Sequence, residues 1–155
     1  MSIERVRKFF EKKGIADRIL EFGEESTTVE MASEIIGCSP ARICKAMAYE
    51  GRDGECILIQ SAGDAKVSNS KFKQVFGFRP TMMSREKTAE MTGHEIGGIC
   101  GFAIENPKVK VYCDRSVTRF QTLFPACGSD GSAIEMTVDE LLRYSDSMGL
   151  IDVCR

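Results

Sequence analysis

The chain has 155 residues, of which 43% are apolar and 28% charged, and its formal net charge is −2. This composition is ordinary for a soluble globular protein, and the length favours one domain, so we expect residues 1–155 to form a single unit. The weak negative charge argues against broad, non-specific nucleic-acid binding. No apolar run approaches the roughly 20 residues of a membrane-spanning helix, and the first residues lack the apolar region of a signal peptide.

The cysteines and the single histidine, His94, limit the metal and redox chemistry that we expect. The number of cysteines is odd and none forms a Cys-x-x-Cys pair, which favours reduced, buried thiols in a cytoplasmic protein. With one histidine and no ligand-like spacing, we expect neither a metal nor another cofactor. The seven cysteines are Cys38, Cys44, Cys56, Cys100, Cys113, Cys127 and Cys154.

The first third of the chain predicts helices and one short strand. Ser2 can cap a helix that ends at Gly14, and residues 19–22 predict a strand. Thr27 with a glutamate three residues later is a capping-box pattern, although its hydroxyl could also contact a ligand. Ser39 followed by proline predicts a further helix start.

Lys45 is the only charged residue in the apolar run from Ile43 to Tyr49. A lysine in such a run either extends its amine to solvent or finds an anionic partner. The run alone leaves both interpretations open.

The middle of the chain predicts a central strand, two capped helices and a glycine-rich loop. Residues 56–59 are apolar without interruption, typical of a strand buried on both faces. Ser68 and Ser84 can each cap a helix. Residues 92–102, the glycine loop, contain four glycines between apolar segments, so their amides could bind an anion or the loop could be a simple connector.

The last third predicts strands at 109–113 and 133–136 and a helix opened by a capping box of Thr137 and Glu140. Helices alternate irregularly with strands, and several strands come late in succession. This order favours an α+β fold with a mixed sheet.

Residues 65–87 carry six basic side chains and one acidic one. This local excess could contact a phosphate backbone, or it could be a solvated helix face, which is the commoner case. The basic residues are Lys66, Lys71, Lys73, Arg79, Arg85 and Lys87.

The chain resembles the YbaK/ProX-type aminoacyl-tRNA editing domains, which also occur as an insertion in prolyl-tRNA synthetases. The resemblance covers nearly the whole chain and is most specific where a lysine and a glycine loop occur in this order. The matching segments are residues 26–30 (Ser-Thr-Thr-Val-Glu), 40–45 (Pro-Ala-Arg-Ile-Cys-Lys), 63–67 (Gly-Asp-Ala-Lys-Val), 92–99 of the glycine loop, 111–114 (Val-Tyr-Cys-Asp) and the region of Gly128.

The resemblance implies a compact α+β domain with a barrel-like mixed sheet of six or seven strands flanked by helices. It implies a trans-editing hydrolase, an aminoacyl-tRNA deacylase that cleaves the ester of alanine or cysteine on proline tRNA, with tRNA and a prolyl-tRNA synthetase as partners. The implied catalytic residues are Lys45, which contacts the terminal nucleotide, and Gly97 and Gly98, whose amides face the ester carbonyl. The residues expected to bind substrate are Thr27, Ile99, Cys100, Gly101, Phe102 and Gly128, and those expected to contact tRNA are Lys66, Lys71 and Lys73.

Three residues depart from the family pattern. Cys100 and Gly101 stand where members commonly have polar or proline residues, and Ala133 stands where the cysteine-specific editors have an aspartate. Cys100 could be a nucleophile, but without an adjacent base a packed thiol is the better interpretation. These departures keep two alternatives open: a non-catalytic protein that binds tRNA, a nucleotide or a synthetase, and an esterase of small aminoacyl esters.

Overall fold

The computed structural model describes residues 2–22 and 28–155. In this part of the chain no helix combines the length and the apolar character needed to cross a membrane. The described helices are α1 (Ser2–Lys13), α2 (Val29–Ile36), α3 (Asn69–Phe76), α4 (Arg85–Thr92) and α5 (Val138–Tyr144). The described strands are β1 (Ile19–Glu21), β2 (Ile43–Glu50), β3 (Cys56–Ala62), β4 (Val109–Asp114), β5 (Thr122–Pro125), β6 (Ser132–Ile134), β7 (Met136–Thr137) and β8 (Leu150–Ile151).

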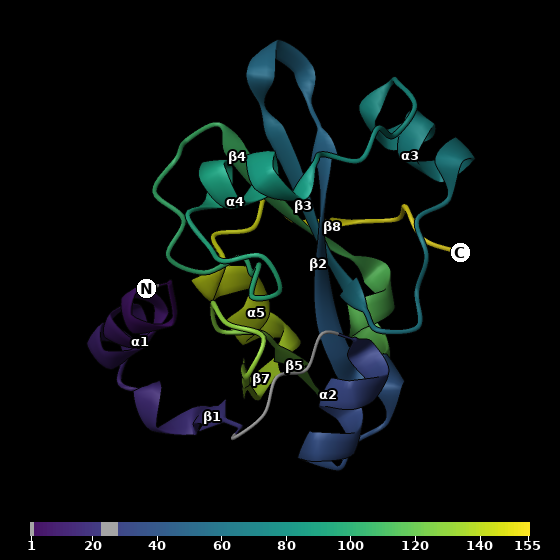
Figure 1. The fold of residues 1–155 in the computed structure, drawn as a ribbon. Helices are drawn as coiled ribbons and strands as arrows, with labels where there is room; N and C mark the ends of the chain where they lie inside the picture. The colour runs from purple at the N-terminus through teal and green to yellow at the C-terminus, as the bar shows by residue number, and fades with distance from the viewer. Residues whose placement is uncertain (1, 23–27) are drawn as a thin grey trace.

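Six of the strands form one mixed sheet in the order β7-β5-β2-β3-β4-β8, and β1 pairs with β6 in a separate two-stranded sheet. The hairpin of β2 and β3 stands at the centre, with β4 parallel to β3 on one side and β5 parallel to β2 on the other (Figure 1). The sheet curls and helices surround it. This architecture confirms the predicted α+β fold with a mixed sheet.

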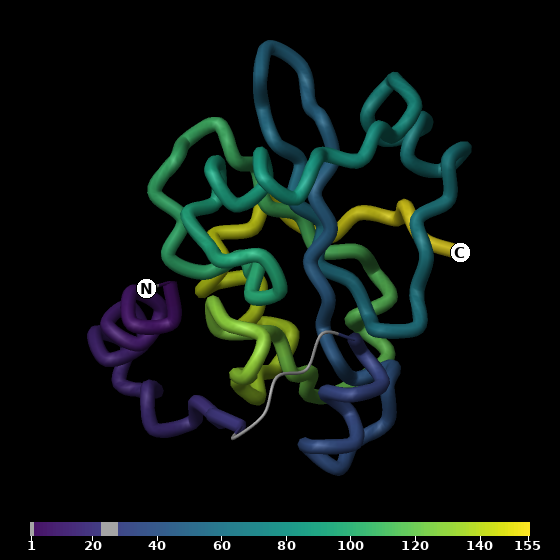
Figure 2. The backbone as a smooth tube through the Cα atoms, viewed as in Figure 1, coloured from purple at the N-terminus to yellow at the C-terminus, as the bar shows by residue number. Residues whose placement is uncertain are grey.

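The central hairpin separates two layers of the core because alternate residues of a strand point to opposite faces. Tyr49, Ile57 and Ile59 pack with Phe72 of α3. Ala48 and its neighbours on the other face pack near α4 and the glycine loop. Figure 2 shows α3 and α4 on opposite sides of the hairpin. Every residue of β3 is buried, as the unbroken apolar run predicts.

The predicted helix caps at Ser68, Ser84 and Thr137 are all present. Ser68 and Ser84 each accept a hydrogen bond from an amide of the first turn, and Thr137 forms a complete capping box with Glu140. A polar side chain that satisfies a free helix amide stabilises a helix by about 1 kcal/mol. These local signals therefore place α3, α4 and α5 correctly.

Four local predictions need correction. Thr28, rather than Thr27, caps α2 by accepting a hydrogen bond from Met31, and Thr27 lies outside the described residues. The segment after Ser39 forms only a short 3-10 turn, Pro40–Arg42. The predicted strand at 133–136 is divided between β6 and β7, and a further strand, β8, follows α5.

Ser2 does not cap α1 either. It is the first residue of the helix, and its hydroxyl donates to the carbonyl of Gly128 and accepts from the amide of Glu95. The start of α1 is thereby joined to two loops that lie far away in sequence.

Candidate active site

A cavity of about 450 Å³ lies between the open edge of β2, the segment that leads into α4, and the glycine loop. We call it the β2 pocket. Lys45 and Gly97 both line it, together with Ile99, so the structure brings three of the residues expected from the sequence into one cavity. The complete lining is Lys45, Ala46, Met47, Ala48, Met82, Met83, Arg85, Thr88, Ile96, Gly97, Ile99 and Asp130.

Lys45 occupies the β2 wall of this pocket, opposite Ser61 in the β2–β3 ladder. Its side chain is half-buried. The hydrogen bond from Arg119 lowers the pKa of Asp64, and the positive charge of Lys45 contributes to the same shift. Lys45 therefore belongs to the pocket lining, and its charge also acts on Asp64, an oppositely charged group outside that lining.

The glycine loop is held from three sides. Arg5 donates to the carbonyl of Gly93 at 2.9 Å, where α4 ends. The ring of His94 bonds to the carbonyl of Phe102 at 2.7 Å and so closes the loop on itself. With the bond from Glu95 to the Ser2 hydroxyl, these contacts fix the loop before any ligand binds.

Gly97 and Gly98 differ sharply in their surroundings. Gly97 is exposed at the pocket, with φ of +94°, a value that favours glycine. Gly98 is buried, and its amide donates to the carbonyl of Glu95 at 2.9 Å within a tight turn. The Gly98 amide is therefore already bonded, whereas within the described residues the Gly97 amide has no protein acceptor.

The side chains of two residues of the glycine loop, His94 and Cys100, are buried in the core. The exposed fraction of each side chain is 2%. Burial lowers the pKa of His94, and the nearby cation of Arg5 adds to this effect. Because Arg5 can only donate, Nδ1 of His94 accepts, and Nε2 donates to Phe102. Burial raises the pKa of Cys100 to about 12, so its thiol stays protonated at neutral pH.

Among the described residues expected to bind substrate, Cys100, Gly101, Phe102 and Gly128 are not part of the pocket lining. Phe102 is fully buried and packs edge-to-face on Phe10. A Cβ on Gly101 would lie 2.8 Å from the Gln60 side-chain oxygen, and one on Gly128 would lie 2.8 Å from the backbone of Ser2. Gly101 and Gly128 therefore allow close packing of backbone and side chains around the glycine loop.

The pocket lining also contains four residues that the sequence did not mark as site residues: Met82 and Met83 before α4, Arg85 and Asp130. Asp130 faces the loop, because a Cβ on Gly97 would lie 3.2 Å from the Asp130 Cβ. The methionine segment reaches β2 through a bridge between Tyr49 and Met82. A polar residue inside the Gly/Ser-rich segment before β6 was the one signal for Asp130, and only the fold reveals its contact with the loop.

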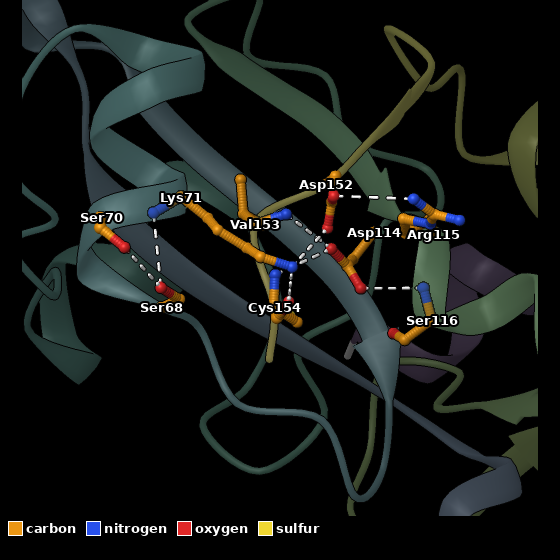
Figure 3. Close-up of polar contacts among 9 residues, drawn as sticks. All are labelled: Ser68, Ser70, Lys71, Asp114, Arg115, Ser116, Asp152, Val153 and Cys154. Atoms are coloured by element: carbon orange, nitrogen blue, oxygen red, sulfur yellow. Dashed lines mark hydrogen bonds and ion pairs between the residues drawn. The ribbon is translucent and has the colours of Figure 1, made fainter.

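The basic residues expected to contact tRNA are not part of the pocket lining. Lys66 and Lys73 are exposed. Lys71 instead ties down the C-terminal segment, because its amine donates to Asp152 at 3.1 Å and to the carbonyl of Cys154 at 3.0 Å (Figure 3). Arg85 is the basic residue of this run that lines the pocket.

A curled mixed sheet with a cavity at a strand edge, lined by a glycine loop, defines an α+β domain with a candidate site at the sheet edge. The sequence model of the aminoacyl-tRNA editing domain matches residues 23–144. The chain belongs to this aminoacyl-tRNA editing domain family.

One relative and two solved structures indicate how far the similarity extends. The chain is 47% identical over 155 residues to the Uncharacterized protein YwhH of Bacillus subtilis (strain 168), which covers all of this chain and 98% of that protein. The structure of the present chain is similar to that of a candidate trans-editing enzyme for prolyl tRNA synthetase. The TM-score is 0.87 and the identity 22%, and the alignment covers 99% of this chain and 97% of that chain. A hypothetical protein of known structure aligns with a TM-score of 0.85, 20% identity, and coverage of 97% and 99%. The two solved structures support the fold.

Proposed function

We propose that this protein is a trans-editing deacylase that hydrolyses the ester between a wrong amino acid, alanine or cysteine, and proline tRNA. The observation that carries the proposal is the placement of Lys45 and Gly97 in one pocket of an editing-family domain. The cavity of about 450 Å³ has room for a small aminoacyl group and part of the terminal nucleoside. In this proposal the protein acts in the cytoplasm, where charged tRNA is found, with a prolyl-tRNA synthetase as its partner.

The reaction requires that water add to the ester carbonyl and that the bond to the ribose oxygen break. The proton from water passes to that ribose oxygen, which leaves free amino acid and tRNA. Negative charge develops on the carbonyl oxygen, and an amide aimed at this position stabilises the transition state, with one donor worth about 10²–10³ in rate. We assign this task to the Gly97 amide.

Lys45 has a positioning task in this scheme. Its amine would bind a phosphate or ribose oxygen of the terminal nucleotide and so hold the ester beside the loop. Arg85, on the same pocket, would add a guanidinium that pairs well with phosphate. Neither His94 nor Cys100 is used, since both side chains are buried in the core.

The first prediction concerns Lys45. We expect Lys45→Ala to lower kcat/KM for the preferred mischarged tRNA by about 10²-fold, because the ester is no longer held in place. The measurement is deacylation of proline tRNA charged with alanine, cysteine, serine or proline. Lys45→Arg should restore part of the activity, and Lys12→Ala, an exposed lysine of α1 outside the pocket, is the matched control.

Full activity of Lys45→Ala would contradict the proposal. The absence of turnover by wild type on the whole panel, with tRNA still bound, would instead favour a non-catalytic binding protein. The occupied amide of Gly98, which leaves one fewer donor for an oxyanion, is the observation that keeps this second function in view.

A further inference from the structure

The edge of β2 that faces the pocket is open at one residue only. The neighbouring strand β5 pairs with β2 at Ile43 and Cys44 and goes no further. On the other side, the carbonyl of Ala48 accepts from the Met83 amide at 3.0 Å. Between these two contacts lies Ala46, which lines the pocket.

The register of the hairpin fixes the direction of the Ala46 peptide groups. The Gly51 amide donates to the Glu55 carbonyl, so Glu50 and Cys56 form a non-hydrogen-bonded pair. Bonding and non-bonding pairs alternate along an antiparallel ladder, so Ala48 and Ala46 are also in non-bonding pairs with β3. Their N–H and C=O groups therefore point away from β3, as the Ala48–Met83 bond shows directly.

Ala46 thus presents a backbone donor and a backbone acceptor to the same side, toward the pocket. Within the described residues, neither group has a protein partner on that edge. An open strand edge of this kind is a template for one more extended residue. The ligand that fits must offer an acceptor and a donor at the spacing of a peptide residue.

An aminoacyl ester has this pattern, since its α-ammonium replaces the N–H of an added residue and its carbonyl oxygen replaces the C=O. We propose, on the basis of the deacylase function above, that the Ala46 main chain binds the aminoacyl group as one residue of an added antiparallel strand. The Ala46 carbonyl accepts from the α-ammonium, and the Ala46 amide donates to the ester carbonyl. The Ala46 amide is then the second oxyanion donor beside Gly97. It takes the role that the family resemblance implied for the Gly98 amide, which is bonded to Glu95.

The decisive variant is full-length protein in which Ala46 is replaced by lactic acid, which changes its N–H to an ester oxygen and leaves the side chain unchanged. Single-turnover deacylation of alanyl-tRNA should slow by about 10²-fold, the usual effect of removing one oxyanion donor. The matched control replaces Ile59 of β3 by its α-hydroxy analogue, because Ile59 lies outside the pocket lining and the change leaves both Ala46 peptide groups intact. Ile59 and Met47 form a bonding pair of the ladder, so this change should lower the melting temperature and leave the rate near that of wild type.

The ammonium contact is tested on the wild-type protein with tRNA that carries lactate in place of alanine. Each rate is divided by the spontaneous hydrolysis rate of the same ester, because the ammonium also activates the ester chemically. We expect the acceleration to fall about tenfold or more for the lactyl ester, the effect of losing a charge-assisted hydrogen bond. Equal accelerations for both esters, or a wild-type rate for the Ala46 variant, would overturn the inference.

A binding measurement separates this inference from the proposed function. The probe is 3′-alanylamino-3′-deoxyadenosine, which contains an amide and is not hydrolysed. It should bind the Ala46 variant about tenfold more weakly than wild type, with or without turnover of the natural ester. If the wild-type protein does not deacylate tRNA but still binds the probe more tightly than the Ala46 variant does, the proposed function is wrong and the Ala46 contact holds. Equal affinities of the two proteins would reject the contact alone.

Discussion

Two neighbouring glycines of the same loop have different reasons to be glycine. Gly97 has a positive φ and open access to the pocket, so its requirement is conformational. Gly98 is constrained by space, since a Cβ there would lie 2.3 Å from both the Gly128 carbonyl carbon and the Ser129 nitrogen. A distance this short against backbone atoms cannot be relieved by a side-chain rotation, so the loop itself would have to move.

We therefore expect Gly98→Ala to destabilise the protein by about 1–3 kcal/mol, the usual cost of overpacking a buried site. It should also lower kcat/KM, because the loop that holds Gly97 is displaced. Chemical denaturation and the deacylation assay measure the two effects. The control is Gly14→Ala, which has φ of +76° but open space around it, and should cost about 1–2 kcal/mol without loss of activity. Normal activity of Gly98→Ala would show that the turn is not part of the site.

At the scale of elements, Asp114 at the end of β4 fastens the C-terminal segment to the sheet. Its carboxylate accepts from the amides of Val153 at 2.9 Å, Cys154 at 3.1 Å and Ser116 at 2.8 Å (Figure 3). Burial by itself raises the pKa of Asp114, but the hydrogen bonds from Val153 and Ser116 outweigh it and keep the pKa below the ordinary value of 3.8.

A carboxyl group with a lowered pKa stabilises the fold above its ordinary pKa, and this contribution is lost as the pH falls through the folded-state value. We expect Asp114→Asn to reduce the free energy of unfolding by about 1.5–3 kcal/mol at pH 7, the range for hydrogen bonds to a charged group. The difference from wild type should shrink below about pH 4. Urea unfolding at several pH values measures both quantities.

Asp152 offers a matched comparison in the same cluster. It is exposed and pairs with Lys71 at 3.1 Å and Arg115 at 3.6 Å. Asp152→Asn should cost less than about 1 kcal/mol, because exposed ion pairs contribute little. If both substitutions have the same effect, the backbone contacts of Asp114 do not fasten the segment.

Local chemistry explains which elements could be predicted from the sequence. The hydroxyl caps at Ser68, Ser84 and Thr137 act within one helical turn, and the apolar run of β3 needs no partner to be recognised. By contrast, β8 consists of two residues whose strand character depends on pairing with β4. The contact between Gly97 and Asp130 joins loops 33 positions apart, and no local pattern encodes it. The resemblance to the editing family predicted Lys45 and the glycine loop as site elements. It did not predict that the Gly98 amide donates to the Glu95 carbonyl, because that bond depends on the turn geometry of the folded loop.

Over the whole molecule, the two faces of the central hairpin carry different candidate contacts for tRNA. The pocket face has Arg85, whereas Lys73 belongs to α3 on the other face and Lys66 precedes that helix. Lys71 is a poor site for a test, because its amine stabilises the C-terminal segment. Charge removal at Arg85, Lys73 and Lys66 therefore tests which face of the hairpin the acceptor stem contacts.

Binding of uncharged proline tRNA should weaken with salt, since each phosphate that the protein neutralises releases counterions. We expect Arg85→Ala, and also the double variant Lys66→Ala with Lys73→Ala, to reduce the log–log salt slope by about 1 for each phosphate that is no longer neutralised. Fluorescence titration at several salt concentrations measures the slope. A reduced slope for Arg85→Ala alone would place the tRNA on the pocket face only, and unchanged slopes for both variants would exclude these residues as phosphate ligands.

The narrow opening beside Ala46 also affects how this protein behaves at high concentration. Long exposed strand edges let sheets of separate molecules join and aggregate. β2 spans eight residues, yet β5 and the Met82–Met83 segment cover its outer edge on either side of Ala46. One residue offers too few hydrogen bonds to hold a neighbouring chain against the entropy of association. The central strand can therefore keep an open edge at the pocket without becoming a seed for self-assembly.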